Sequence, residues 1–160
     1  MKLNLGCGPS YKDGYVNCDK DSFLKIDKMV DVRNPLPFSN ESAEIVCTEN
    51  LLDSLTKEHG LKLIREIWRI LVPNGTWEFI QGDVAVNPDM CFGWPFFVSG
   101  WTRNDFRHYT IGEASYENWK EPWDLPGFCY GHIEHNANGI MLGTLIKPNA
   151  IESQARTQKG

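Results

Sequence analysis

Short apolar runs separated by polar turn residues dominate the first half of the chain. The runs are rich in β-branched residues, and Gly, Pro, Asn or Asp stands at their ends, a pattern typical of strands. The pattern predicts five strands, at Lys2–Cys7, Tyr15–Cys18, Lys28–Val32, Ala43–Thr48 and Thr76–Gln81.

One segment has helical periodicity instead. Between Thr56 and Leu71 apolar residues recur at spacings of three and four, which places them on one face of an amphipathic helix. Thr56 can act as the N-cap, although His59 is a poor capping partner, and the sequence VPNG at 72–75 ends the helix. We therefore expect one long helix between the fourth and fifth strands.

The last part of the chain predicts a hairpin. Two strand-like runs, Phe128–Glu134 and Ile140–Ile146, flank Asn138-Gly139, a dipeptide favoured in tight β-turns. Strands joined by a helix and followed by a hairpin indicate an α/β protein with a mostly parallel central sheet and a C-terminal antiparallel hairpin. In such open sheets ligands bind beyond the carboxyl ends of the strands, so a site is expected in the loops that begin there.

Length and composition fit a single domain. The chain has 160 residues, 41% hydrophobic and 23% charged, and we expect one domain over 1–148 with a polar C-terminal tail over 149–160. The net charge of −5 without a basic run argues against nucleic acid as a partner. No apolar run is long enough to span a membrane and no signal-peptide pattern is present, so we expect a cytoplasmic protein whose cysteines are free thiols, mostly buried.

The stretch LNLGCGPSYKDGYVNCD, at 3–19, carries the main chemical signal. Two glycines separated by one residue follow an apolar run, and Asp19 ends the next predicted strand. A dinucleotide site needs a third glycine where Tyr11 stands, and a helix facing the pyrophosphate, but the segment 9–14 has room for one turn at most. The residues alone leave three interpretations open: a phosphate-free cofactor such as S-adenosylmethionine, a dinucleotide, or an antiparallel hairpin without a cofactor.

Three stretches resemble, in order, the opening motifs of class I S-adenosylmethionine-dependent methyltransferases. They are LNLGCGPSYKDGYVNCDKD, DVRNPLPFSNESAEIVCTENLLDSL and LIREIWRILVPNGTWEF, and the resemblance covers roughly residues 2–82. The most similar branch of that family is one in which the glycine loop runs almost directly into the second strand. The resemblance implies a Rossmann-like fold and S-adenosylmethionine as the cofactor.

The same resemblance implies roles for individual residues. The glycine loop would wrap the methionine part, Asp19 would bind the ribose hydroxyls, and Asp31 with Val32 would lie at the adenine. Asp31 also suits a structural role, as the cap of the turn that follows it. Glu49 and Asn50 would flank the methionine end. The implied cofactor-binding residues are Leu5, Gly6, Cys7, Gly8, Asp19, Asp31, Val32, Glu49 and Asn50.

Methyl transfer from an activated sulfonium requires the protein to align the acceptor and, where needed, to remove its proton. Many members of the family that the chain resembles have HVLEH after the fourth strand, whereas this sequence reads NLLDS at 50–54. Asn50 can orient an acceptor but cannot take its proton, so Asp83 and His108 are the candidate bases. The absence of both histidines keeps open a non-catalytic S-adenosylmethionine-binding or regulatory protein of the same fold.

Residues 92–130 hold twelve of the nineteen aromatic residues of the chain. One interpretation is that the connection over 83–127 forms an aromatic-rich acceptor pocket or lid, with Arg103 and Arg107 available to an anionic or sugar acceptor. The acceptor would then be a small molecule or a sugar. The other interpretation is core packing in a chain that is short of helices. Since the two histidines at 132 and 135 fall on opposite faces of a strand, we expect no metal site.

Overall fold

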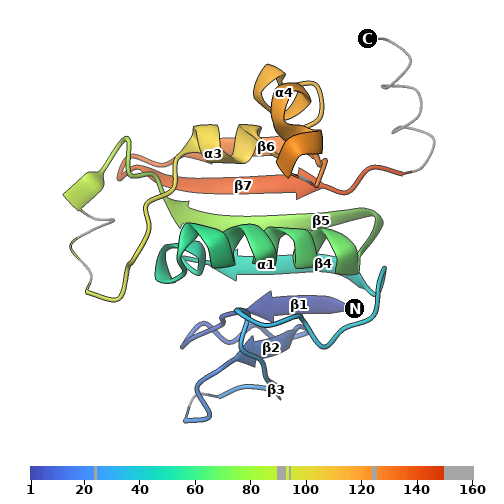
Figure 1. Cartoon of the computed structure of the whole chain (residues 1–160). Helices are drawn as coiled ribbons and strands as arrows, with labels where there is room; N and C mark the ends of the chain where they lie inside the picture. Colours follow the sequence, from blue (N-terminus) through green and yellow to red (C-terminus); the bar gives the residue numbers. More distant parts are fainter. Residues whose placement is uncertain (24, 90–92, 94, 124–125, 150–160) are drawn as a thin grey trace.

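The computed structural model of the chain contains one sheet of seven strands in the order β3-β2-β1-β4-β5-β7-β6 (Figure 1). The structure describes residues 1–23, 25–89, 93, 95–123 and 126–149, so the tail over 150–160 lies outside the described residues. The strands are β1 (Lys2–Leu5), β2 (Val16–Asp19), β3 (Lys28–Met29), β4 (Ala43–Glu49), β5 (Leu71–Gly82), β6 (Cys129–His135) and β7 (Ile140–Ile146). The helical elements are the 3-10 turn η1 (Leu52–Ser54) and the α-helices α1 (Lys57–Ile70), α3 (Arg103–Arg107) and α4 (Ala114–Trp123).

The strand directions confirm the expected architecture. β1 pairs in parallel with both β2 and β4, and the pairs β2–β3 and β4–β5 are parallel as well. β7 is antiparallel to both β5 and β6, which makes the C-terminal hairpin. Parallel pairing of β1 with β2 excludes the interpretation of the glycine-rich stretch as an antiparallel hairpin.

The connection from β1 to β2 contains no helix, and the side chain of a buried asparagine is hydrogen-bonded to its backbone. The Asn17 side chain is fully buried and accepts hydrogen bonds from Asn4 Nδ2 at 2.9 Å and from Lys12 N at 2.8 Å. Its own amide nitrogen donates to the backbone oxygens of Lys12 and Tyr15, both at 3.0 Å. One side chain therefore satisfies backbone groups that the folded loop would otherwise bury unpaired.

Four strands differ in length from the prediction: β1 ends at Leu5 rather than Cys7 and β4 at Glu49 rather than Thr48, and β3 and β5 differ more. β3 ends at Met29 rather than Val32, because the backbone after Val30 turns away at Asp31. β5 begins at Leu71 rather than Thr76, immediately after α1, because Leu71 already pairs with β4. The predicted helix itself is confirmed.

The helices lie over one face of the sheet (Figure 1). The α1 helix begins after Thr56, whose side chain accepts a hydrogen bond from His59 N at 3.3 Å. Its buried stripe packs into the core that also contains apolar residues of β1, β4 and β5. In the described part of the chain, no helix is both long and apolar enough to cross a membrane.

Part of the aromatic segment packs into this core. The Phe106 ring of α3 stacks on Phe79 of β5, with ring centroids 4.2 Å apart and an interplanar angle of 10°. Trp101 and Phe128 are also buried, at 1% and 0% exposed. Packing therefore accounts for these three side chains of the segment, while its residues 92 and 94 lie outside the described residues.

The cysteines follow the expectation as far as the structure describes them. The thiols at 7, 18, 47 and 129 are free and buried, and Cys91 lies outside the described residues. Burial, as the main cause, raises the pKa of the Cys18 thiol to about 12 and that of the Cys47 thiol to about 11. Both side chains are therefore neutral near pH 7.

Candidate functional site

A cavity of about 590 Å³ lies at the carboxyl ends of β1, β2, β3 and β4. Its volume is within the range typical of sites for small ligands. Six of the nine predicted cofactor residues line it: Gly6, Asp19, Asp31, Val32, Glu49 and Asn50. Of the other three, Leu5 is the last residue of β1, and Cys7 and Gly8 belong to the glycine loop that follows it.

The glycine loop follows β1, and at Gly6 its backbone lines the cavity without a side chain in between. Gly6 has a φ of 62° and Gly8 a φ of 50°, conformations that residues with a Cβ atom rarely adopt. A Cβ atom on Gly6 would collide with the side chain of Leu51, which lines the same cavity. Cys7 N donates to Cys18 O at 3.0 Å, which extends the pairing of β1 with β2 into the loop. Glycine at position 6 is therefore required by both backbone angle and space.

Asp19 holds two loops together at the edge of the cavity. Its carboxylate accepts hydrogen bonds from Gly8 N at 2.9 Å and from Asp21 N at 3.1 Å, and the residue is 9% exposed. A carboxylate has lone pairs for about four hydrogen bonds, so these two leave acceptor capacity on the cavity side. Asp19 can thus fix the glycine loop and still accept from a ligand.

Asp31 lines the cavity and caps a turn at once. Its side chain accepts hydrogen bonds from Arg33 N at 3.0 Å and Arg33 Nε at 2.9 Å, and pairs with the guanidinium as a bidentate ion pair. Hydrogen bonding to Arg33 is the main cause that lowers the pKa of Asp31 to about 2. The structural role considered for Asp31 is therefore present, in a residue that also faces the cavity.

The residues that follow β4 complete the cavity beside the glycine loop. Glu49 forms an ion pair with Lys12 at 2.6 Å. Asn50 has a φ of 46°, and its backbone nitrogen donates to Ile80 O at 2.8 Å, so the chain turns sharply there. This turn leads the chain into η1, where Leu51 and Ser54 also reach the cavity.

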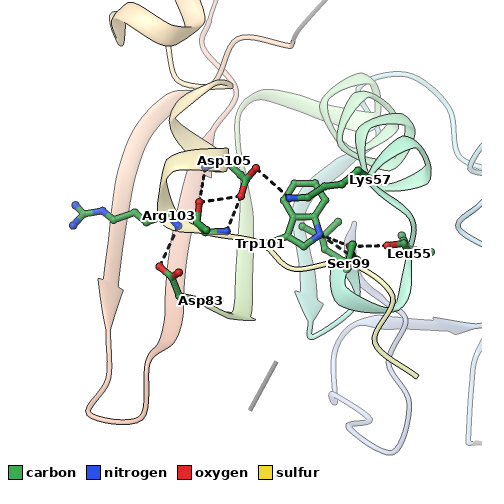
Figure 2. A network of polar contacts seen from close by, with 9 residues as sticks. Leu55, Lys57, Asp83, Ser99, Trp101, Arg103 and Asp105 are labelled. Atoms are coloured by element: carbon green, nitrogen blue, oxygen red, sulfur yellow. Dashed lines mark hydrogen bonds and ion pairs between the residues drawn. The ribbon is translucent and has the colours of Figure 1, made fainter. Parts of the chain in front are cut away.

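Residues 99–101, which we call the strap, are hydrogen-bonded to the turn after β4 (Figure 2). Ser99 Oγ donates to Leu55 O at 2.7 Å, and Trp101 Nε1 donates to Ser99 Oγ at 3.0 Å. Lys57 Nζ lies 3.7 Å from the centroid of the Trp101 ring and 3.1 Å from Asp105 Oδ1. These contacts fix the strap against the first turn of α1.

Two aromatic side chains border the cavity without being buried. Phe96, just before the strap, is 70% exposed, and Phe23, after β2, is 82% exposed. Both leave a ring face accessible to a ligand. Of the described aromatic side chains in 92–130, Phe96 is the one that lines this cavity.

Asp83 is engaged by protein groups beyond the end of β5. Its carboxylate accepts hydrogen bonds from Ala85 N at 2.9 Å and from Arg103 N at 3.2 Å, the latter shown in Figure 2. His135 Nε2 lies 2.7 Å from the same carboxylate. Asp83 is 2% exposed and does not line the cavity described above. Its hydrogen bond from Arg103 N instead stabilises the chain just after the strap.

The structure also places His108 away from the cavity. His108 follows α3 and lines a separate hollow with Arg107 and Glu113, which form an ion pair at 2.6 Å. Of the three predicted catalytic residues, the structure brings Asn50 to the cavity and leaves Asp83 and His108 outside it. Among the described residues no group of three or more potential ligands is arranged to hold a metal ion.

The pattern of the sequence did not point to one buried carboxylate, which lies in η1 beside the cavity-lining residue Ser54. Asp53 in η1 is 0% exposed, and among the described residues neither of its side-chain oxygens has a hydrogen-bond partner. The side-chain nitrogen of buried Gln81 is also without one. Burial is the main cause that raises the pKa of Asp53 to about 6. The available signal was an acid directly after two leucines in NLLDS.

No protein-family model and no curated protein sequence matches the chain. Solved structures match its fold. A chain of the Haloferax volcanii complex between the Trm112 methyltransferase activator and a methyltransferase has a TM-score of 0.66 and 15% identity, over 92% of this chain and 82% of that one. The S-adenosylmethionine-dependent methyltransferase of Mesorhizobium loti has a TM-score of 0.61 and 11% identity, with 91% and 89% covered. A methyltransferase of the same type from Methanosarcina mazei has a TM-score of 0.57 and 13% identity, with 91% and 89% covered.

Proposed function

From the class I methyltransferase fold of this chain, we propose that it is a methyltransferase that uses S-adenosylmethionine. The observation that carries the proposal is the gathering of Gly6, Asp19, Asp31 and Asn50 around one cavity at the carboxyl edge of the sheet. These residues come from loops far apart in the sequence, and the motifs had predicted each of them as a cofactor residue.

The residues present fit this cofactor better than a dinucleotide. No helix follows the glycine loop in the described chain, so the backbone offers no row of N–H groups to a pyrophosphate. The cavity instead has carboxylates at Asp19, Asp31 and Glu49, which suit the hydroxyl and amino groups of S-adenosylmethionine. The two cations that line the cavity, Lys20 and Arg33, are each paired with a carboxylate, so a phosphate-bearing ligand would meet more negative than positive charge.

Each residue has a definite task in this proposal. Asp19 accepts hydrogen bonds from the ribose hydroxyls. Asp31 lies at the adenine, where it accepts from the adenine amine in exchange for one of its four hydrogen bonds from Arg33. Glu49 binds the amino group of the methionine part. The bound cofactor supplies an activated methyl group, so the protein has to align an acceptor rather than create a strong electrophile.

The acceptor enters, in this proposal, beside Asn50 and Phe96. The Asn50 side chain can orient an acceptor hydroxyl or amine, and the exposed Phe96 and Phe23 rings suit a sugar or another flat small molecule. We therefore propose a small-molecule or sugar acceptor. Since the Haloferax volcanii neighbour was solved in complex with a methyltransferase activator, we extend the proposal to a protein partner for this chain.

Calorimetric titration tests the cofactor. We expect S-adenosylmethionine to bind and NAD to bind more weakly or not at all. Asp19→Ala should weaken binding by about 1–3 kcal/mol, because hydrogen bonds to a charged group are lost, whereas Asp13→Ala, in the exposed part of the glycine loop, should not. Tighter binding of NAD, or an equal response of both variants, would contradict the proposal.

A second measurement separates an enzyme from a binding protein. S-adenosylhomocysteine would be measured after incubation with S-adenosylmethionine and a panel of glycans and metabolites. Production above the level of the Asp19→Ala variant supports the enzyme. Tight cofactor binding without any production across the panel would favour the non-catalytic interpretation.

A further inference from the structure

The helices that Figure 1 labels lie over one face of the sheet, and the opposite face carries none of them. β1, β4 and β5 are parallel strands in the middle of the sheet, and parallel strands are normally covered on both faces. The glycine loop covers this face over β1 and β2, where Asn4 and Asn17 are buried. Over β5 and β7 the described chain places no helix, and Leu142 remains 37% exposed.

A groove of about 250 Å³ lies on this open face. The strand register places Cys47 of β4 beside Glu78 of β5, and Ile80 of β5 beside Leu142 of β7. Lys12 of the glycine loop forms one wall. The groove therefore has apolar side chains at Ile80 and Leu142, polar groups toward β4, and the polar residues His132 and Thr144 toward β6 and β7.

The polar part of the groove has more negative than positive charge. Lys12 Nζ is paired with Glu49 at 2.6 Å. For the half-buried Glu78 carboxylate, the hydrogen bond recorded among the described residues comes from Cys47 Sγ at 3.5 Å, and a thiol is a weak donor. Since Glu49 already has Lys12 as its partner, Glu78 is the carboxylate of the groove for which the described residues show no ion pair, whereas His132, which also lines the groove, pairs with Glu134 at 3.1 Å.

We propose that this groove is the docking site of a partner protein, which covers it with an apolar helix that carries a lysine or arginine to Glu78. The apolar side chains of Ile80 and Leu142 favour an apolar side chain of the helix, and the charge of Glu78 favours a basic one. A second copy of this chain suits the groove less well. A twofold contact would bring the same acidic patches of two chains together.

The test uses two synthetic helical peptides that share one leucine face and differ in their flanking residues, lysines in one and glutamates in the other. Each would be titrated into the isotope-labelled full chain and followed by NMR. We expect the lysine peptide to shift the amide signals of Ile80, Leu142 and Thr144 and to bind more tightly than the glutamate peptide. Glu78→Gln should weaken the lysine peptide about fivefold, as expected for loss of a partly exposed ion pair.

Glu58→Gln is the matched control, because the Glu58 side chain is 74% exposed on α1, on the covered side of the sheet. It should leave binding unchanged, and the spectra of both variants report whether they are folded. Equal binding of the two peptides, or shifts confined to the cofactor cavity, would overturn the proposal. A dimer in sedimentation that Leu142→Arg abolishes would assign the face to a second copy and also overturn it. The test needs no cofactor, so it is independent of the proposed activity.

Discussion

Replacement of Asp53 by asparagine is expected to stabilise the protein at neutral pH. Asp53 is 0% exposed, and its carboxylate oxygens have no hydrogen-bond partner among the described residues. A buried carboxylate without a paired cation is unfavourable in its charged form. Asparagine has nearly the same shape and carries no charge, so the substitution removes the charge without creating a cavity.

The magnitude follows from the shift in pKa. Burial raises the pKa of Asp53 from 3.8 to about 6. The folded state therefore holds the proton more tightly than the unfolded state. The stabilisation from this group is complete below about pH 4 and is lost as the pH rises through about 6. At about 1.4 kcal/mol for each pKa unit, the loss is about 3 kcal/mol above pH 6.

Urea unfolding of the wild type and of Asp53→Asn between about pH 4 and about pH 8 measures this loss. We expect the variant to be more stable by about 3 kcal/mol at pH 7.5 and nearly equal to the wild type at the acid end. Asp13→Asn, at an exposed position, serves as the control and should follow the wild type. A destabilised Asp53→Asn at pH 7.5, or an unchanged pH dependence, would refute the reasoning.

Three further predictions concern the loop and the cavity. Asn17→Ala should lower the unfolding free energy by about 3 kcal/mol in urea, because several buried backbone groups lose their partner; a loss below about 0.5 kcal/mol would contradict the role of Asn17. Gly6→Ala should weaken S-adenosylmethionine binding at least about tenfold in calorimetry, since the added Cβ meets Leu51 and the φ of 62° is strained; unchanged affinity would remove this loop from the site. Phe96→Ala should change the unfolding free energy by less than about 0.5 kcal/mol, because the ring is 70% exposed, but raise the KM of the acceptor; a large loss of stability would assign Phe96 to packing instead.

The sequence predicted those parts of the fold that depend on local pattern. The apolar stripe of α1 and the turn at Asn138-Gly139 are local features, and both elements formed where the pattern placed them. The direction of β2 relative to β1 was not predictable from spacing, because it depends on the side-chain hydrogen bonds of buried Asn17. β5 began early because pairing with β4 competes with the end of the helix.

In the candidate site, too, the residues that depend on local pattern were predictable and those that depend on tertiary contacts were not. Glycines and acids at strand ends were recognisable, since their function depends on backbone angle and on strand termini. Asp83 and His108 were chosen by residue type alone. Their positions depend on how the segment after β5 folds, and that segment ties Asp83 to the backbone of Arg103. The carboxylate of Asp53 was missed because its burial arises only when the strap closes over η1.

The strand order has a consequence for how the chain folds during synthesis. Among the described strands β1 is synthesised before the others, and it is flanked on both edges, by β2 and by the later β4. β5 gains its second neighbour only when β7 has been made, through pairs such as Thr76 with Ile146. Because such distant pairings form slowly, the nascent chain exposes unpaired strand edges until its last strand emerges. Segments that are finished early therefore depend on the final hairpin for protection from aggregation.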